Sequence, residues 1–347
     1  ALGGERYGDN APRAENAFAF VQHDWETRRV ALNASARLDA YGDVGTRVSP
    51  KVAALVRGDL ARVRLSVGSG FKAPDFRQLY LEFSNAVGGY TLFGADRLED
   101  GLARLEAQGR YTPVATSGDA LDALRPETSV AVNLEVETTI AGVEVTAGVF
   151  RNAVRDLIDV QPVALLADGA PVLSYVNLER IRTEGLTLEA RRGVGAWSLQ
   201  AGYQWLRSRD LDVLAELGDG TVFGRDPVTG RDRRLAPGDY ANLFGRSSHS
   251  VTARAGVRTG DWTGSLRGRW RSRYGLRDLD GNGFANRDDE FVPGTALFDL
   301  AVARDLEVGA TGLRLQLGID NLLDTTRPAL VPTLAGRRFF AAATLSL

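Results

Sequence analysis

Apolar and polar side chains alternate with a period of two residues along much of this chain. In residues 128–138 the apolar positions are Val130, Val132, Leu134 and Val136. In residues 312–321 they are Leu313, Leu315, Leu317 and Ile319. Successive side chains of a β-strand point to opposite faces, so this period predicts strands with one apolar and one polar face. The fold class predicted from the pattern is therefore all-β.

The alternation predicts roughly thirteen strands, many of them longer than the ~5–6 residues of a globular strand. Their expected ranges are 16–26, 28–40, 46–57, 60–71, 127–140, 143–160, 172–191, 196–208, 248–259, 262–274, 295–305, 312–321 and 337–347. Such lengths suit the ~9–11 residues of a tilted strand that crosses a membrane. No apolar run reaches the ~18 residues that a membrane helix needs.

Short and long connections take turns between these strands. Short turns are expected near residues 26–28, 57–59, 141–142, 193–195, 259–261 and 307–312. The other connections are 72–126, 161–171, 209–247, 275–294 and 322–336, which are long, and 41–46, which is short. In an up-and-down meander every second connection lies on the same side, so nearly all the connecting length falls on one rim. Outer-membrane barrels show this pattern of short periplasmic turns and long outer loops.

The tryptophans lie near the ends of predicted strands. They are Trp25, Trp197, Trp205, Trp262 and Trp270. Trp197 and Trp262 each follow a short turn, and Trp205 and Trp270 come eight residues later on the same face. Eight strand residues span about 26 Å, or about 20 Å along the membrane normal at a ~40° tilt, close to the height of an apolar membrane band. The spacing predicts two aromatic girdles.

The polar face of the strands bears on the alternative of a soluble β-sandwich with tryptophans in its core. Charged residues such as Arg254, Arg267 and Glu135 cannot pack a dry interior without pairing. They suit the wet lumen of a wide barrel, or the outside of a sandwich. The long loops and the unbroken meander favour the barrel.

Composition excludes several classes of function. The 347 residues are 44% hydrophobic and 25% charged, which is typical of a folded chain. There is no cysteine, which removes disulfides, cysteine-ligated metals and thiol catalysis. The net charge of −2 disfavours nucleic acid as a partner. No Ser/His/Asp constellation, phosphate loop or HExxH motif occurs, so we do not expect an enzyme.

Four groups of residues, spread along the whole chain, share one property: each resembles a segment of the TonB-dependent outer-membrane receptors, in the same order. They are Ser49-Pro50-Lys51 with residues 65–76 and Leu79-Tyr80; residues 124–129; Asn177-Leu178 with residues 183–186; and residues 321–324 with Pro332, Gly336-Arg337 and Phe339. Such barrels have 22 strands and a plugged lumen. The chain departs from the family at Leu347, where an aromatic residue is usual.

The resemblance implies an antiparallel up-and-down transmembrane β-barrel in the bacterial outer membrane, in contact with its lipid. We expect residues 1–347 to be the C-terminal ~13 strands, with the plug domain and the first ~9 strands outside this chain. The implied function is active uptake of a scarce small-molecule ligand, most often a ferric siderophore, less often cobalamin or a glycan. Outer loops would bind the ligand, and the TonB–ExbB–ExbD complex would act on the plug. This transport requires no cofactor. The alternatives are a passive porin-type barrel and a soluble β-sandwich binding domain.

One loop resembles a calcium-binding EF-hand loop. Asp278, Asp280 and Asn282 occupy positions 1, 3 and 5, and a glycine follows at position 6. Position 12 is Asp289 in place of the usual glutamate, and Glu290 comes next. Two interpretations stay open: a structural Ca²⁺ site that fixes an outer loop, or a solvated turn rich in Asp, Asn and Gly.

The longest connection, 72–126, holds the candidate ligand contacts. Its aromatic residues include Tyr80, Phe83, Tyr90 and Phe93, and residues 98–111 have the pattern of a short amphipathic helix. Loops of this length are usually functional or disordered. Ligand contact is one interpretation of these aromatic residues, and packing within the loop is the other.

Overall fold

The computed structural model describes residues 15–42, 45–85, 90–112, 122–167, 170–226, 228–309, 311–331 and 333–346. Pro332 and Leu347, which entered the family comparison above, lie outside these residues. Thirteen strands of the described chain form one continuous path: β1 (Asn16–Glu26), β2 (Val30–Tyr41), β3 (Gly45–Arg57), β4 (Ala61–Lys72), β8 (Glu127–Ile140), β9 (Val143–Leu166), β10 (Pro171–Val194), β11 (Trp197–Asp210), β14 (His249–Thr259), β15 (Trp262–Arg271), β18 (Thr295–Val308), β19 (Thr311–Asp320) and β20 (Arg338–Ser346).

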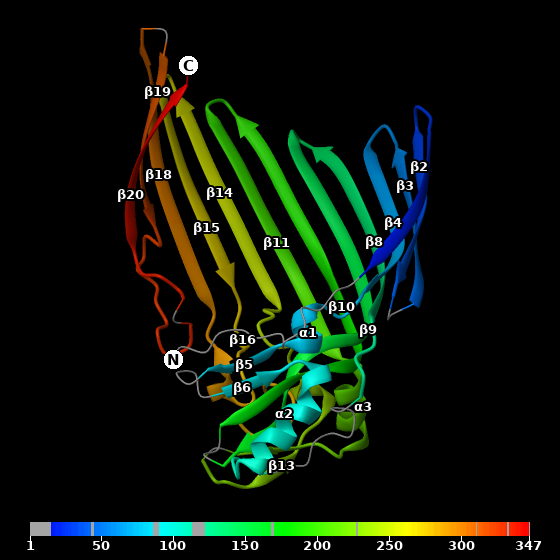
Figure 1. The fold of residues 1–347 in the computed structure, drawn as a ribbon. Coiled ribbons are helices and arrows are strands. Elements are labelled where there is room, and N and C mark those ends of the chain that lie inside the picture. Colours follow the sequence, from blue (N-terminus) through cyan, green and yellow to red (C-terminus); the bar gives the residue numbers. More distant parts are fainter. Residues whose placement is uncertain are drawn as a thin grey trace.

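Each strand of this path pairs antiparallel with the next, which confirms the predicted meander. The sheet curves strongly and stays open, with β1 and β20 at its two edges (Figure 1). Among the described residues, no helix combines the length and the apolar character needed to cross a bilayer.

Cross-strand pairing gives the sheet two faces of different chemistry. On the apolar face, Leu65 lies beside Leu134, and Leu134 remains 39% exposed although it is a large apolar residue. One residue earlier along β4, on the polar face, Arg64 lies beside Glu135 and forms an ion pair of 2.7 Å. A wall of this kind is stable when lipid covers its apolar face and water wets its polar face.

The tryptophans occupy the two ends of the apolar face. Trp197 and Trp262, both 52% exposed, begin β11 and β15 directly after short turns. Trp205 and Trp270 lie near the other ends of the same strands, where their neighbours include Leu186 and Val251. These four tryptophans therefore lie where the sequence pattern predicted them, at the two ends of one face.

The long connections all emerge at one end of the sheet and carry the short elements of the chain (Figure 1). The 72–126 connection forms α1 (Phe76–Tyr80), β5 (Glu82–Asn85), β6 (Tyr90–Phe93), α2 (Ala95–Ala107) and β7 (Tyr111–Thr112). Later connections form α3 (Leu211–Asp219), β12 (Phe223–Arg225), β13 (Asp232–Arg234), η2 (Pro237–Asp239), β16 (Tyr274–Gly275), η3 (Asp288–Glu290) and β17 (Phe291–Val292).

The hairpin of β9 and β10 is longer than the sequence pattern predicted. Residues 161–171 were expected to be a long loop, but most of them continue the two strands. The extension is stabilised by the 72–126 connection, because β6 pairs in parallel with residues 172–174 of β10 and β7 pairs with residues 165–166 of β9. The prediction of a loop here was wrong because strands from elsewhere in the chain supply the pairing.

Candidate functional site

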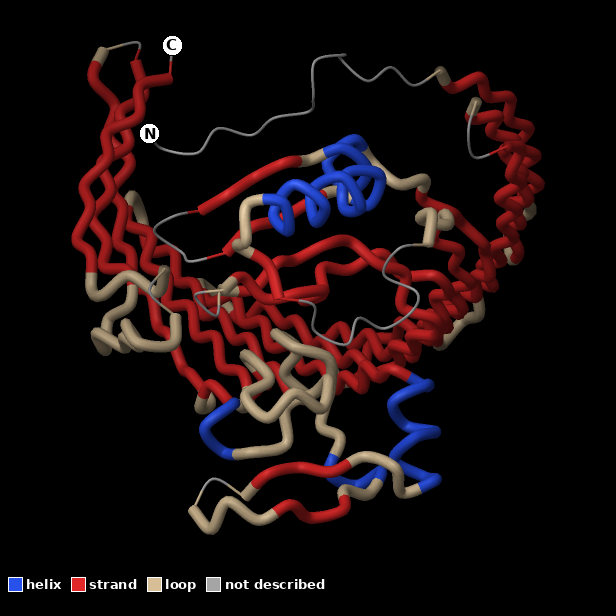
Figure 2. Tube along the Cα trace, turned by 60° about the horizontal axis from the view of Figure 1, so that its bottom comes forward, coloured by secondary structure: helices blue, strands red, loops and turns tan. Residues whose placement is uncertain are grey.

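The described part of the 72–126 connection packs onto the far end of the β9–β10 hairpin and forms a compact unit, called here the outer-loop cap (residues 76–85 and 90–112 with 157–167 and 170–178). Figure 2 shows its two helices between the arms of the curved sheet. Leu98 is fully buried, and Phe93 and Val172 lie in the same apolar cluster. The predicted helix exists, although α2 runs from Ala95 to Ala107 and not over residues 98–111.

Close contacts fix the geometry of the outer-loop cap. A Cβ atom on Gly101 would lie 2.7 Å from the ring of Phe93, so only glycine lets α2 approach β6 this closely. A Cβ on Gly94 would overlap the backbone of Leu79, which places the end of α1 against the start of α2. The first turn of α1 is held by a capping box in which Asp75 accepts from the backbone N–H of Gln78 at 2.9 Å.

Asn177 joins the end of the 72–126 connection to the hairpin. Its Oδ1 accepts from the backbone N–H of Arg125 at 2.7 Å, and its Nδ2 donates to the carbonyls of Arg125 at 2.9 Å and Asp156 at 2.7 Å. Arg125 also pairs with the Asp156 carboxylate at 2.7 Å. The sequence marks Asn177 only as part of a motif, because its structural role depends on a contact between residues 52 positions apart.

The four candidate aromatic residues all lie in the outer-loop cap, but in different environments. Phe93 is 4% exposed in the apolar cluster, so this candidate is corrected to a core residue that a ligand cannot reach in this conformation. Phe83 and Tyr90 are half-buried neighbours on the β5–β6 hairpin, with ring centroids 6.0 Å apart. Tyr80 is half-buried, and the guanidinium of Arg97 lies 6.0 Å from its ring. Tyr80, Phe83 and Tyr90 remain candidates.

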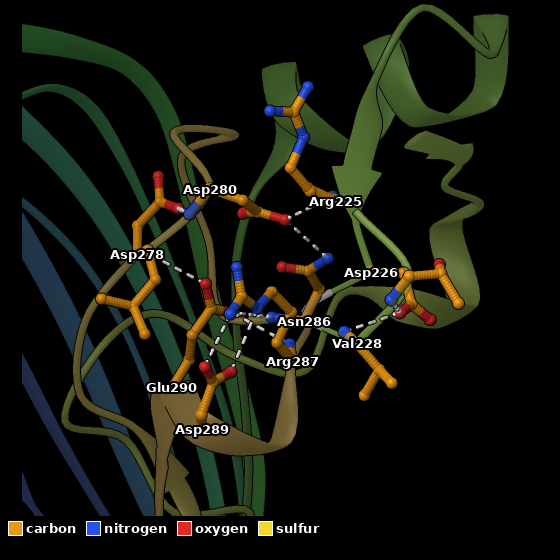
Figure 3. A network of polar contacts seen from close by, with 11 residues as sticks. Arg225, Asp226, Val228, Asp278, Asp280, Asn286, Arg287, Asp289 and Glu290 are labelled. Carbon is orange, nitrogen blue, oxygen red and sulfur yellow. Dashed lines mark hydrogen bonds and ion pairs between the residues drawn. The ribbon is translucent and has the colours of Figure 1, made fainter. Parts of the chain in front are cut away.

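Residues 278–290, called here the acidic loop, form a tight turn around Asp278 (Figure 3). The Asp278 carboxylate accepts from the backbone N–H groups of Asp280 at 3.1 Å, Gly281 at 2.7 Å and Gly283 at 2.7 Å. The φ angles of Gly281 and Gly283 are +77° and +89°, which other residues rarely adopt. The glycine at position 6 of the motif therefore serves the turn that the sequence predicted.

Glu290 is the buried centre of the acidic loop. Its side chain has no exposed surface, and it accepts backbone hydrogen bonds from Leu279 at 2.8 Å, Asn286 at 2.8 Å and Arg287 at 2.9 Å. Carboxylate oxygens of Asp278, Asp280 and Glu290 lie within 4.8 Å of one another. Burial raises the pKa of the Asp280 carboxyl, and the nearby Glu290 charge adds to the shift.

The side chains of two other predicted metal ligands have partners elsewhere in the loop. Asp289 faces Arg287, with which it forms an ion pair of 2.6 Å. Asn282 uses its side chain within the turn, donating to Asn286 at 3.1 Å and accepting from the backbone N–H of Phe284 at 3.2 Å. Glu290 and not Asp289, the residue at position 12 of the motif, therefore contributes the third carboxylate of the cluster.

A second long connection packs against the acidic loop, which the sequence did not predict. The backbone N–H of Arg225, at the end of β12, donates to Asp280 at 2.9 Å. Beneath this contact, Tyr240 and Phe284 pack with ring centroids 5.1 Å apart in an apolar cluster. Burial raises the pKa of Tyr240 to about 12, so its hydroxyl stays neutral. The two connections form one ordered body beyond the end of the sheet.

Comparison with known proteins identifies the architecture. The family described as "TonB dependent receptor-like, beta-barrel" matches residues 2–322. No curated protein sequence matches the chain.

Three solved structures show the same fold at low sequence identity. The siderophore receptor PirA from Pseudomonas aeruginosa has 16% identity and a TM-score of 0.61, over 96% of this chain and 49% of that one. A mutant ferric enterobactin receptor, PfeA, from the same organism has 16% identity and a TM-score of 0.60, over 90% and 40%. The copper transporter OprC has 17% identity and a TM-score of 0.57, over 90% and 42%. The chain spans less than half the length of each, and it belongs to the TonB-dependent receptor-like β-barrel family.

Proposed function

We propose that the chain forms wall and outer loops of an outer-membrane receptor that actively imports a scarce small-molecule ligand. The observation that carries the proposal is the ordered outer-loop cap at the end of a sheet with an apolar face and a polar face. Members of this family are outer-membrane transporters, and we propose that TonB–ExbB–ExbD transmits the energy of the proton-motive force to this one. Transport makes and breaks no bond in the ligand, so no catalytic role is proposed.

A ferric siderophore is the proposed ligand class, with cobalamin and glycans as less favoured alternatives. Two of the similar structures are siderophore receptors, and a third is a copper transporter. Tyr80, Phe83 and Tyr90 offer aromatic surface on the outer-loop cap, and Arg97 lies beside Tyr80. Aromatic rings can pack against the organic groups of an iron chelate, and the adjacent cation suits a chelate that carries negative charge.

Uptake of radiolabelled ferric siderophore by cells that carry or lack the intact receptor tests this proposal. We expect saturable uptake that requires the receptor and is abolished by a protonophore, because the transport needs the proton-motive force. Uptake that rises linearly with concentration and resists the protonophore would indicate a passive porin. Release of the protein from cells without detergent would indicate a soluble β-sandwich.

We also propose that the acidic loop binds a structural Ca²⁺ through Asp278, Asp280 and Glu290. The raised pKa of Asp280 gives the sign of the pH dependence. An acid whose folded-state pKa is raised stabilises the fold below its unfolded pKa, and this contribution is lost as the pH rises through the folded pKa. Without Ca²⁺ the loop should therefore loosen as Asp280 ionises, and Ca²⁺ should offset this because it favours the charged form.

Hydrogen exchange of residues 278–290, with and without Ca²⁺, measures this effect. Ca²⁺ should slow exchange in the natural receptor and leave an Asp280→Asn variant unchanged. Asp289→Asn is the matched control, because Asp289 faces Arg287 and should be dispensable. Equal exchange with and without Ca²⁺ in the natural receptor would show that the loop binds no Ca²⁺. Loss of the Ca²⁺ effect in Asp289→Asn would show that Asp289 is a ligand, as the EF-hand spacing predicts.

A further inference from the structure

Arginines are concentrated on the apolar side of the sheet, just beyond the aromatic girdle on the long-loop side. Val149, Leu186 and Trp205 are cross-strand neighbours in one row of β9, β10 and β11. Two residues further along the same face, the next row is Arg151, Glu184 and Arg207. Since two strand residues advance about 6.6 Å, these charges lie directly outside the apolar band.

The following rows on this face continue the pattern. Arg182 lies beside Arg209, and Arg155 lies beside Arg180. We call these residues the arginine patch: Arg151, Arg155, Arg180, Arg182, Arg207 and Arg209. Like charges directly opposite each other destabilise a sheet unless an anion offsets them. Two such pairs on adjacent strands concentrate positive charge at this end of the sheet, which nearby anions must offset.

The carboxylates of the described chain offset the arginine patch only in part. Glu184 lies 3.9 Å from Arg207, and Asp212 at the start of α3 accepts from Arg180 Nε at 2.8 Å. The Nε atoms of Arg182 and Arg209 are buried and have no hydrogen-bond partner among the described residues. The side chains of Arg180 and Arg207 are 53% and 43% exposed, so an anion outside the chain can reach this face of the patch. A guanidinium forms charge-assisted hydrogen bonds with phosphate oxygens.

We propose that the arginine patch binds the phosphate groups of anionic lipids in the outer leaflet. This inference rests on the proposed location of the barrel in a membrane, but not on the imported ligand. The location favours a lipid over a soluble anion, because the patch continues the face that carries Trp205 and the apolar band. Phosphate headgroups occupy that depth wherever lipid covers the band, whereas a ligand in the lumen would meet the opposite face. The contact would anchor the β9–β10 hairpin and, with it, the outer-loop cap.

Native mass spectrometry of the intact receptor, released from phosphatidylcholine nanodiscs, tests the proposal. One set of nanodiscs contains added phosphatidic acid, and the other contains diacylglycerol, which has the same tails without the phosphate. The receptor should retain phosphatidic acid and not diacylglycerol. An Arg182→Gln/Arg209→Gln variant should retain at least about tenfold less phosphatidic acid, because each basic residue near a lipid surface contributes to the attraction.

Two further variants separate lipid binding from folding and from general charge. Arg182→Lys/Arg209→Lys keeps the charge and should keep most of the retention. Arg254→Gln/Arg267→Gln removes an arginine pair that is also cross-strand but lies on the polar face, and it should not change retention. A heat-modifiability gel and circular dichroism check that every variant forms its sheet.

The outcomes that overturn the proposal are specific. Equal retention of phosphatidic acid and diacylglycerol would show that only the tails are bound. Displacement of phosphatidic acid by millimolar inorganic phosphate would assign the patch to a soluble anion. Equal losses in the two glutamine variants would show a general charge effect. Siderophore uptake is not a readout here, so a receptor that imports a different ligand gives the same lipid result.

Discussion

Replacing Leu98 with aspartate should detach α2 from the outer-loop cap and lower ligand uptake about tenfold or more, while the sheet stays intact. Leu98 has no exposed surface and lies among Phe93, Leu105 and Val172. A buried carboxylate without a partner costs several kcal/mol, which exceeds what a small packed unit can lose and stay closed. The thirteen long strands do not depend on this contact, because they pair with one another, and only the outer ends of β9 and β10 pair with strands of the cap.

Ala103→Asp is the matched control, since it places the same carboxylate on the exposed side of the same helix. It changes helix propensity and charge as Leu98→Asp does, but it leaves the apolar cluster intact. Uptake and limited proteolysis of residues 95–112 are the measurements. Normal uptake by Leu98→Asp, with α2 cleaved rapidly, would show that the outer-loop cap is not needed for transport. Loss of the heat-modifiable form would show that the sheet depends on the cap.

The sheet was predictable from the sequence because one physical constraint acts on every strand. A strand between lipid and water must alternate, so β8 was expected at residues 127–140 and runs from Glu127 to Ile140. Strand ends outside the membrane do not lie between lipid and water, so their side chains need not alternate. Residues 163–166, Val-Ala-Leu-Leu, lose the alternation because the outer-loop cap buries most of them, and the extension of β9 was therefore missed.

The loop structures were only partly predictable, because they depend on contacts between distant residues. Helix α3 was missed although Asp210 caps it through the N–H groups of Asp212 and Val213 and Gly220 ends it with a φ of +69°. Those two residues are a recognisable start and stop signal. The burial of Phe93 had no local signal, because it follows from packing against distant segments. The preference for Glu290 over Asp289 follows from backbone hydrogen bonds within its own loop, which the spacing of the motif alone does not give.

The assignment of the two faces of the sheet is the central claim, because the wall, the girdles and the arginine patch all depend on it. The chain holds no cysteine, so a single introduced cysteine reports on one position. Asn133 and Leu134 are adjacent in β8 and face opposite sides. Asn133 donates to Ser66 at 3.3 Å on the polar face, whereas Leu134 lies beside Leu65 on the apolar face.

Fluorescence quenching of a label at Asn133→Cys and at Leu134→Cys, in the intact receptor in lipid vesicles, tests this claim most directly. Brominated lipid should quench the label at 134 about tenfold more than the label at 133, and aqueous iodide should give the reverse order, because alternate strand residues face lipid and lumen. Iodide quenching at both positions, with no effect of brominated lipid at either, would contradict the account and indicate a β-sheet in water.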